Sequence, residues 1–215
     1  MKTIPSLQVI TDEVLQTRFS HLELAQLAVE GGADAVQYRE KRPLTTQAML
    51  TVAAEMLAAC GETLLIVDDR VDVARSIGAR AVHLGRSDLD VRTARAILGD
   101  AAIIGGTANS YEEARAVWQS GVDYLGVGPI YGTTSKENPA PVMGLAVLAR
   151  ICADSPLPIV AIGSITAARI PEVLAAGAHG VAVLSEVLLA ADPVEATRRC
   201  RAAIDAAIDA RGVAR

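Results

Sequence analysis

The feature that most constrains the fold of this chain is a regular alternation between short β-branched segments and longer helical segments. The short segments are bounded by Gly, Asp or Pro, and the longer ones carry Ala, Leu, Arg and Glu at helical spacing. The predicted strands are 6–11, 33–40, 63–69, 81–85, 102–108, 123–131, 158–165 and 180–187. The predicted helices are 21–32, 45–60, 70–78, 90–99, 111–121, 143–155, 167–178 and 192–211.

Strands and helices in strict alternation predict an α/β protein with a single (β/α)8, or TIM, barrel. Nearly continuous apolar strands such as 63–67 favour a parallel sheet that is covered on both faces. The alternative is an open doubly wound sheet, but no Gly-x-Gly-x-x-Gly fingerprint opens the first helix to support it. We expect one domain over residues 1–215, with a tail that frays after about residue 206.

Composition narrows the kinds of partner. The 215 residues are 51% hydrophobic but only 3% aromatic, and the net charge is −5. This charge opposes binding to nucleic acid or anionic lipid, and so few aromatic residues give no base-stacking surface. No stretch approaches the roughly 20 apolar residues of a membrane span. Three cysteines without Cys-x-x-Cys spacing predict reduced thiols in a cytoplasmic protein. We therefore expect small-molecule substrates and no membrane or nucleic-acid partner, and a homo-oligomer is compatible with the sequence.

In a (β/α)8 barrel the active site forms at the carboxyl ends of the strands, here called the mouth. Asp69 and Asp88 follow adjacent predicted strands and can share one Mg²⁺, which prefers one or two carboxylates together with phosphate oxygens. Cations suited to a phosphate-rich ligand follow the second and sixth strands: Arg39, Lys41 and Lys136. The usual phosphate position after the last two strands is taken by Gly163, Ser164 and Ser185.

Each candidate also has a purely structural interpretation. Segment 68–70 can cap the following helix, 39–41 can be a solvated charged run, and 133–136 can be an ordinary polar loop. Gly163 can be present because the chain packs tightly there, and His83 can be a core histidine whose ring nitrogens are hydrogen-bonded within the fold. We prefer the functional interpretation because all these clusters fall at the same phase of the repeat, which random surface charge would not produce. The only aromatic residues expected near the mouth are Tyr38 and Tyr131.

Motifs spread in order over nearly the whole chain resemble those of the thiamine phosphate synthase family and its thiazole tautomerase relatives. They are Gln-Tyr-Arg-Glu-Lys at 37–41, Asp-Arg-Val-Asp-Val-Ala at 69–74, His-Leu-Gly at 83–85, Gly-Pro-Ile-Tyr at 128–131 with Thr133, Ser135 and Lys136, and Ala-Ile-Gly at 161–163. The resemblance implies a (β/α)8 barrel. It also implies a transferase that joins hydroxymethylpyrimidine diphosphate to hydroxyethylthiazole phosphate and releases pyrophosphate.

The resemblance further implies a role for each candidate residue. Mg²⁺ would be held by Asp69 and Asp88. The pyrophosphate would be bound by that Mg²⁺ and by the catalytic cations Arg39, Lys41 and Lys136. The pyrimidine pocket would include Gln37, Asp68 and Thr107. The thiazole and its phosphate would be bound by Thr133, Ser135, Gly163, Ser164 and Ser185.

The chain departs from the family pattern at several of these positions. Asp68 replaces a usual Asn, Arg86 a usual Gln, and Ser164 a usual Gly. We hypothesise that Asp68 and Arg86 form a charge pair across adjacent strands. Asn109 stands where the tautomerase relatives carry a proton-transferring His, and Asn is neither acid nor base near neutral pH. This counts against a tautomerase. The alternatives that stay open are a tautomerase-like isomerase and a non-catalytic, regulatory thiazole-phosphate-binding paralogue.

Overall fold

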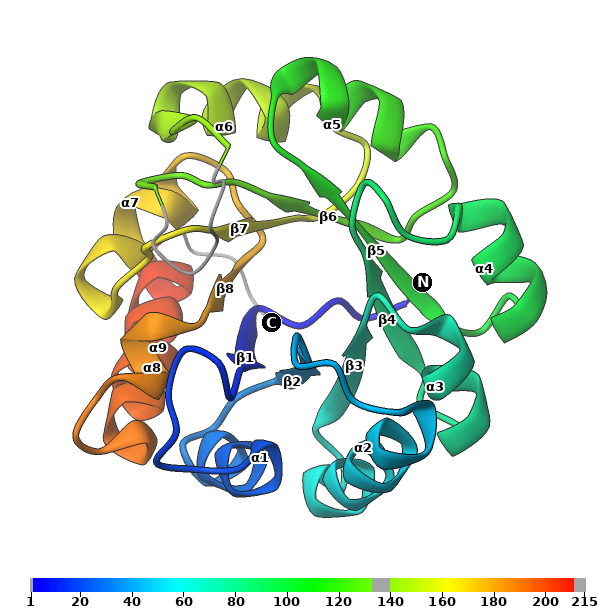
Figure 1. Cartoon of the computed structure of the whole chain (residues 1–215). Coiled ribbons are helices and arrows are strands. Elements are labelled where there is room, and N and C mark those ends of the chain that lie inside the picture. Colours follow the sequence, from blue (N-terminus) through cyan, green and yellow to red (C-terminus); the bar gives the residue numbers. More distant parts are fainter. Residues whose placement is uncertain (1, 133–139, 211–215) are drawn as a thin grey trace.

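The structure is a computed structural model that describes residues 2–132 and 140–210. Its centre is a closed barrel of parallel strands that are hydrogen-bonded in chain order, with the last strand beside the first (Figure 1). The strands are β1 Leu7–Thr11, β2 Ala35–Tyr38, β3 Leu64–Asp68, β4 Ala81–Leu84, β5 Ile103–Ala108, β6 Tyr124–Val127, β7 Ile159–Ile162 and β8 Gly180–Val183. This topology confirms the predicted barrel and excludes the open doubly wound sheet.

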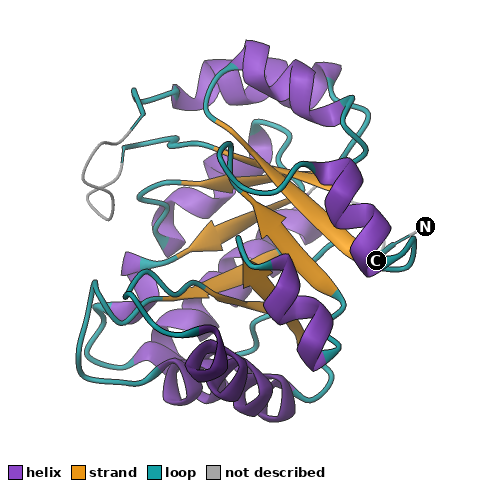
Figure 2. Cartoon of the chain, turned by 45° about the vertical axis from the view of Figure 1, so that its right-hand side comes forward, coloured by secondary structure: helices purple, strands orange, loops and turns teal. Residues whose placement is uncertain are grey.

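Helices surround the barrel and cover the outer face of its sheet, as the two views in Figures 1 and 2 show. They are α1 His21–Glu30, α2 Thr46–Cys60, α3 Val71–Ile77, α4 Val91–Leu98, α5 Tyr111–Trp118, α6 Gly144–Asp154, α7 Ile170–Ala175, α8 Ser185–Leu188 and α9 Pro193–Ala210. A 3₁₀ turn, η1 Ala167–Arg169, precedes α7. Among the described residues, no helix is both long enough and apolar enough to cross a membrane.

Local chemistry accounts for where the helices begin and end. The Ser20 side chain accepts a hydrogen bond from the Glu23 backbone N–H, and the Glu23 carboxylate accepts one in return, which forms a capping box at α1. Asp192 caps α9 by accepting from the Glu195 N–H at 3.0 Å. Gly78 ends α3 with φ at 74°, in the left-handed region that glycine adopts without a Cβ clash.

Several strands are shorter than predicted: those expected to end at 131, 165 and 187 end at Val127, Ile162 and Val183. The predicted strand 180–187 ends at Val183, because the chain then turns into α8, where the Leu188 N–H donates to the Leu184 carbonyl at 2.9 Å. A mainly apolar segment such as 181–189, with Ser185 and Glu186 in its middle, fits a strand or a helix by pattern alone. At the other end of the chain, α9 continues to Ala210, so fraying does not begin at 206.

The core has two layers because alternate strand residues face opposite sides of the sheet. One layer fills the space between the barrel and the helices, and the other fills the barrel with Ile10, Tyr124 and Val160. Tyr38 lies in the outer layer, whereas Ala35 on the same strand packs in the inner one. The expectation that Tyr38 lies at the mouth is therefore wrong: it faces the helices.

Candidate active site

The carboxyl ends of β1, β2 and β3 bring two cations against three carboxylates. Arg39, just past β2, forms an ion pair with Asp12, and its Nε lies 4.0 Å from Asp68 Oδ2. The Nζ of Lys41 lies 3.3 Å from Asp68 Oδ2 and forms a second ion pair with Asp69. The Arg39 side chain is only 16% exposed and that of Lys41 is 37% exposed. These residues are therefore not a solvated charged run, and that structural interpretation is wrong.

Asp69 and Asp88 converge as the sequence predicted. Asp69 has a left-handed backbone, with φ at 63°, and its N–H donates to the His83 carbonyl at 2.9 Å, which ties β3 to β4. Its carboxyl group hydrogen-bonds to that of Asp88, whose Oδ2 also accepts from the Gly85 N–H at 2.6 Å. The next residue, Arg70, holds the N-cap position of α3 but makes no side-chain capping bond, so capping alone does not account for segment 68–70.

This donor set fits a hard divalent cation bound jointly with a substrate. Among the described residues, no group of three or more His, Cys, Asp or Glu side chains is arranged to hold a metal. The adjoining carboxyl groups of Asp69 and Asp88 supply two protein ligands, which is the number that Mg²⁺ commonly takes when phosphate oxygens and water complete its shell.

Burial and charge shift the pKa values of these groups in different directions. Burial raises the pKa of Asp68 to about 6, with a further increase from the Asp69 charge, although Lys41 and Arg39 oppose the shift. Burial acts in the same direction on Asp69, but hydrogen bonds from Asp88 and Lys41 outweigh it and lower the pKa of Asp69. Burial and the bond to Asp69 raise the pKa of Asp88. The two pKa values are thus shifted in opposite directions, and Asp88 binds a proton more readily than Asp69.

Inside the barrel, below these charges, lies a chain of polar side chains. His83 Nε2 lies 2.9 Å from Thr107 Oγ1, and His83 Nδ1 lies 3.1 Å from the Tyr124 hydroxyl. Both imidazole nitrogens have partners, as the core-histidine interpretation predicts. Gly126 makes room for the ring, because a Cβ there would lie 2.7 Å from His83 Cε1. Gln37 is buried and, like Ala35, faces the barrel interior.

The ends of β7 and β8 form a second part of the mouth. Gly163 has φ at +108°, and a Cβ at this position would lie 2.6 Å from Pro129 Cα. This close approach confirms the packing interpretation of Gly163 and leaves the phosphate prediction untested. Ser164 has φ at 48°, and its carbonyl accepts from Arg169 Nη1 at 2.8 Å. Ser185 begins α8, directly after the neighbouring strand.

Several predicted residues lie elsewhere. Thr133, Ser135 and Lys136 fall outside the described residues. The Asp68–Arg86 charge pair is wrong, because Arg86 Nη1 binds Glu113 Oε1 at 2.8 Å while Asp68 faces Lys41. Arg86 has 61% of its side chain exposed, and the aqueous surface satisfies it without a partner in the mouth. Tyr131 donates its hydroxyl hydrogen to Glu172 Oε1 at 2.6 Å.

The sequence analysis missed Asp12. Its side chain is buried, accepts from the N–H groups of Val14 and Leu15 at 2.7 and 2.9 Å, and holds Arg39. A signal for it exists: Asp12 directly follows the predicted strand 6–11, so the strand-end rule applied to the first strand would have included it.

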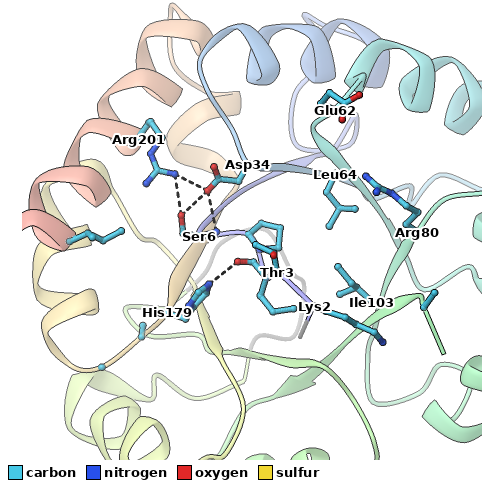
Figure 3. Close-up of a pocket in the computed structure, with 16 residues that line it drawn as sticks. Lys2, Thr3, Ser6, Asp34, Glu62, Leu64, Arg80, Ile103, His179 and Arg201 are labelled. Carbon is cyan, nitrogen blue, oxygen red and sulfur yellow. Dashed lines mark hydrogen bonds and ion pairs between the residues drawn. The ribbon is translucent and has the colours of Figure 1, made fainter. Parts of the chain in front are cut away.

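A hollow of about 1120 Å³ opens at the opposite, amino-terminal end of the barrel (Figure 3). Several of its polar side chains have partners within the fold. Arg201 pairs with Asp34 at 2.7 Å, Lys2 reaches Asp123 at 2.9 Å, and His179 bonds the Ile4 carbonyl at 2.7 Å. This end of a barrel serves stability rather than catalysis, so the mouth remains the candidate active site.

The fold and the mouth together define a class: (β/α)8-barrel proteins whose strand ends suit phosphorylated substrates. The chain belongs to the thiamine monophosphate synthase family, whose sequence model matches residues 7–187.

Individual relatives agree with this membership. The chain is 48% identical to the thiamine-phosphate synthase of Salinibacter ruber, over 95% of this chain and 90% of that protein. It is 41% identical to the thiamine-phosphate synthase of Bacteroides fragilis, over 90% of this chain and 97% of the other. Among solved structures, the thiamine phosphate pyrophosphorylase from Pyrococcus furiosus superposes with a TM-score of 0.85 at 35% identity, covering 94% of this chain and 96% of that one.

Proposed function

We propose that this protein is a transferase of thiamine biosynthesis, which joins hydroxymethylpyrimidine diphosphate to hydroxyethylthiazole phosphate to give thiamine phosphate and pyrophosphate. The observation that carries the proposal is the Arg39–Lys41–Asp69 cluster at the mouth, in a chain that aligns over nearly its full length with thiamine-phosphate synthases. Cations beside a carboxylate pair suit a diphosphate that arrives with a divalent metal.

The chemistry asks the protein to stabilise a leaving group. The bond between the pyrimidine methylene carbon and the diphosphate oxygen breaks, and that carbon then forms a bond with the thiazole ring nitrogen. Negative charge grows on the departing pyrophosphate, so cations already in place lower the barrier without reorganising. No protein nucleophile is needed, which agrees with the engagement of both His83 nitrogens by Thr107 and Tyr124.

Mg²⁺ is part of the proposal. Asp69 and Asp88 would hold it, and when bound it would neutralise charge on the pyrophosphate oxygens. Arg39 and Lys41 would bind the same oxygens from the β2 side, and Lys136, outside the described residues, would add a third cation. Lys41 is suited to this role because Asp68 and Asp69 raise its pKa despite its partial burial, so it stays protonated at neutral pH.

The two heterocycles would occupy different parts of the mouth. Polar groups on β2, β3 and β5 would line the pyrimidine pocket: Gln37, Asp68 and Thr107. The β7 and β8 ends, with the loop after β6, would bind the thiazole and its phosphate: Thr133, Ser135, Gly163, Ser164 and Ser185. Asn109 donates to the Gly128 carbonyl and cannot itself act as an acid or base, which counts against a tautomerase that uses a group at this position. A cytoplasmic location and a homo-oligomeric state stay predictions.

One assay tests the proposal. Purified protein is mixed with the pyrimidine diphosphate, the thiazole phosphate and Mg²⁺, and thiamine phosphate and released pyrophosphate are both measured. Equal amounts of the two products are expected. Folded protein that gives neither product above background would refute the synthase. Isomerisation of the thiazole phosphate without pyrophosphate release would support the isomerase instead, and binding without turnover the regulatory paralogue.

A further inference from the structure

A buried polar cluster lies directly behind the cations of the mouth. We call it the His21 cluster, and its members are Thr11, His21, Tyr38, Glu40 and Arg42. They alternate along the chain with the mouth residues, since Thr11 precedes Asp12 and residues 38, 40 and 42 interleave with 37, 39 and 41. The His21 side chain is 0% exposed and that of Glu40 is 1% exposed. The cluster therefore shares one short stretch of backbone with Arg39 and Lys41, so its packing can bear on where these two side chains start.

The imidazole of His21 joins β1 to the segment after β2. His21 Nδ1 lies 2.7 Å from Thr11 Oγ1, and the Thr11 hydroxyl can donate to the Gln37 carbonyl at 3.2 Å. On its other side, His21 Nε2 lies 3.4 Å from Glu40 Oε2. Glu40 is held in place by Arg42, whose Nη2 lies 2.5 Å from Glu40 Oε2.

The positions of the protons show why the charge on His21 matters. If neutral His21 carries its proton on Nδ1, the Nε2 lone pair faces the Glu40 carboxylate, and that contact is repulsive. If neutral His21 carries its proton on Nε2, the Thr11 hydroxyl must donate to Nδ1 and gives up the Gln37 carbonyl. Only the imidazolium can donate to both Thr11 and Glu40 while Thr11 donates to Gln37. Within the described part of the chain, His21 Nε2 has no hydrogen-bond partner at the observed geometry. Protonation of the ring would let Nε2 donate to Glu40 and shorten that contact.

We propose that His21 is a positioning residue for diphosphate binding, whose protonated ring bridges Thr11 and Glu40 and thereby fixes the strand ends that carry Asp12, Arg39 and Lys41. The inference rests on the proposed function for the identity of the diphosphate ligand. It assigns His21 no contact with substrate.

The surroundings of His21 make its charge responsive to pH. Burial lowers the pKa of His21, and the carboxylates of Glu13 and Glu40, with a smaller effect from Asp12, oppose that shift. Arg42 adds to the lowering, and the Tyr38 ring packs edge-on at 4.8 Å between centroids. The bridge is therefore expected to form as the pH falls below the usual range of a histidine.

Linkage gives a test on the unaltered protein. If protonation of His21 strengthens the binding of pyrophosphate, then bound pyrophosphate must raise the pKa of His21 by the same coupling free energy. The probe is inorganic pyrophosphate with Mg²⁺, and the readout is the NMR titration of the His21 ring with and without it, assigned with the His21→Asn variant. A rise of half a pH unit or more is expected, equivalent to roughly threefold tighter binding to the protonated form. An unchanged pKa would overturn the proposal.

Variants distinguish coupling through the His21–Glu40 bridge from direct attraction between a charged His21 and the pyrophosphate. In Glu40→Gln the carboxylate that faces Nε2 is lost, so the linkage should disappear while pyrophosphate still binds. If the linkage persists in this variant, the coupling does not pass through Glu40 and the proposal fails. His21→Gln should bind pyrophosphate more weakly than the natural protein at low pH, by a factor that approaches threefold as the pH falls below the pKa of His21, and equally at pH 8.5. The matched control is His179→Gln at the amino-terminal end of the barrel. Its affinity for pyrophosphate, relative to that of the natural protein, should be the same at low pH and at pH 8.5.

The synthase assay distinguishes failure of this inference from failure of the proposed function. Protein that binds pyrophosphate with the expected linkage but forms no thiamine phosphate would refute the function and support the inference. Protein that forms thiamine phosphate but shows no such linkage would support the function and refute the inference. Absence of pyrophosphate binding would overturn both.

Discussion

Substitution of Gly163 by alanine tests the close packing at the end of β7. At φ +108° a side chain strains the backbone, which costs about 1–3 kcal/mol. The added Cβ would also lie 2.6 Å from Pro129 Cα and 2.9 Å from the Gly132 carbonyl oxygen, and backbone atoms cannot move aside as a flexible side chain can. Overpacking of this kind costs about 1–3 kcal/mol more. We expect Gly163→Ala to lose about 4 kcal/mol of unfolding free energy in total.

The matched control is Gly121→Ala. Gly121 has φ at +94°, but among the described residues no atom beyond its chain neighbours would lie within 4 Å of an added Cβ. This variant carries the strain without the clash, so it should lose only about 1–3 kcal/mol. Urea unfolding measures both losses, and a thermal melt should separate the two variants by roughly 4–8 °C. In the synthase assay, Gly163→Ala should raise the KM for the thiazole phosphate and leave that for the pyrimidine diphosphate nearly unchanged. Equal urea midpoints for the two variants would refute the packing argument.

Further predictions concern the charged part of the mouth. Asp12→Asn keeps an oxygen for the backbone N–H groups but removes the short ion pair of Arg39 and leaves it only the more distant Asp68, so urea unfolding should show a loss of roughly 3 kcal/mol, and unchanged stability would contradict this role. Because the pKa of Asp68 is raised to about 6, the folded protein binds its proton more tightly than the unfolded chain, and this contribution to stability is lost as the pH rises from 4 to 7. The test compares the unfolding free energy of Asp68→Asn with that of the natural protein, with EDTA present. The difference should shift in favour of the variant by roughly 2–3 kcal/mol between pH 4 and pH 8, and a pH-independent difference would be inconsistent with the raised pKa. Asp69→Asn should raise the Mg²⁺ concentration for half-maximal rate at least about tenfold, and removal of Mg²⁺ with EDTA should abolish product formation in both proteins. Lys136→Ala should slow turnover about a hundredfold, and near-normal kinetics would remove Lys136 from the site.

The sequence predicted that Asp69 and Asp88 gather at one edge of the sheet, although several strands end three to four residues earlier than predicted. Asp69 and Asp88 converge because parallel neighbouring strands place their carboxyl ends at one edge, and the alternation of segments indicates that order directly. The boundary of β8 was wrong for the opposite reason. Residues 181–189, apolar except for Ser185 and Glu186, fit either secondary structure by pattern, whereas in the structure α8 begins at Ser185.

The sequence pattern does not reveal which charged side chains pair, because pairing depends on their positions in the folded structure. Arg86 and Asp68 are plausible partners in sequence, yet Arg86 points to Glu113 at the surface. Asp12 pairs with Arg39 because β1 and β2 are adjacent in the closed barrel.

The sequence by itself therefore determined the barrel, the phase at which its polar residues meet, and the family to which the chain belongs, because each depends on periodicity or short motifs. Only the tertiary structure decided which charges pair, that Tyr38 faces the helices, and that His21 lies buried between Thr11 and Glu40. The physical reason is that a side chain's partners are set by distances of a few ångströms between segments far apart in the chain, and the closed sheet fixes those distances.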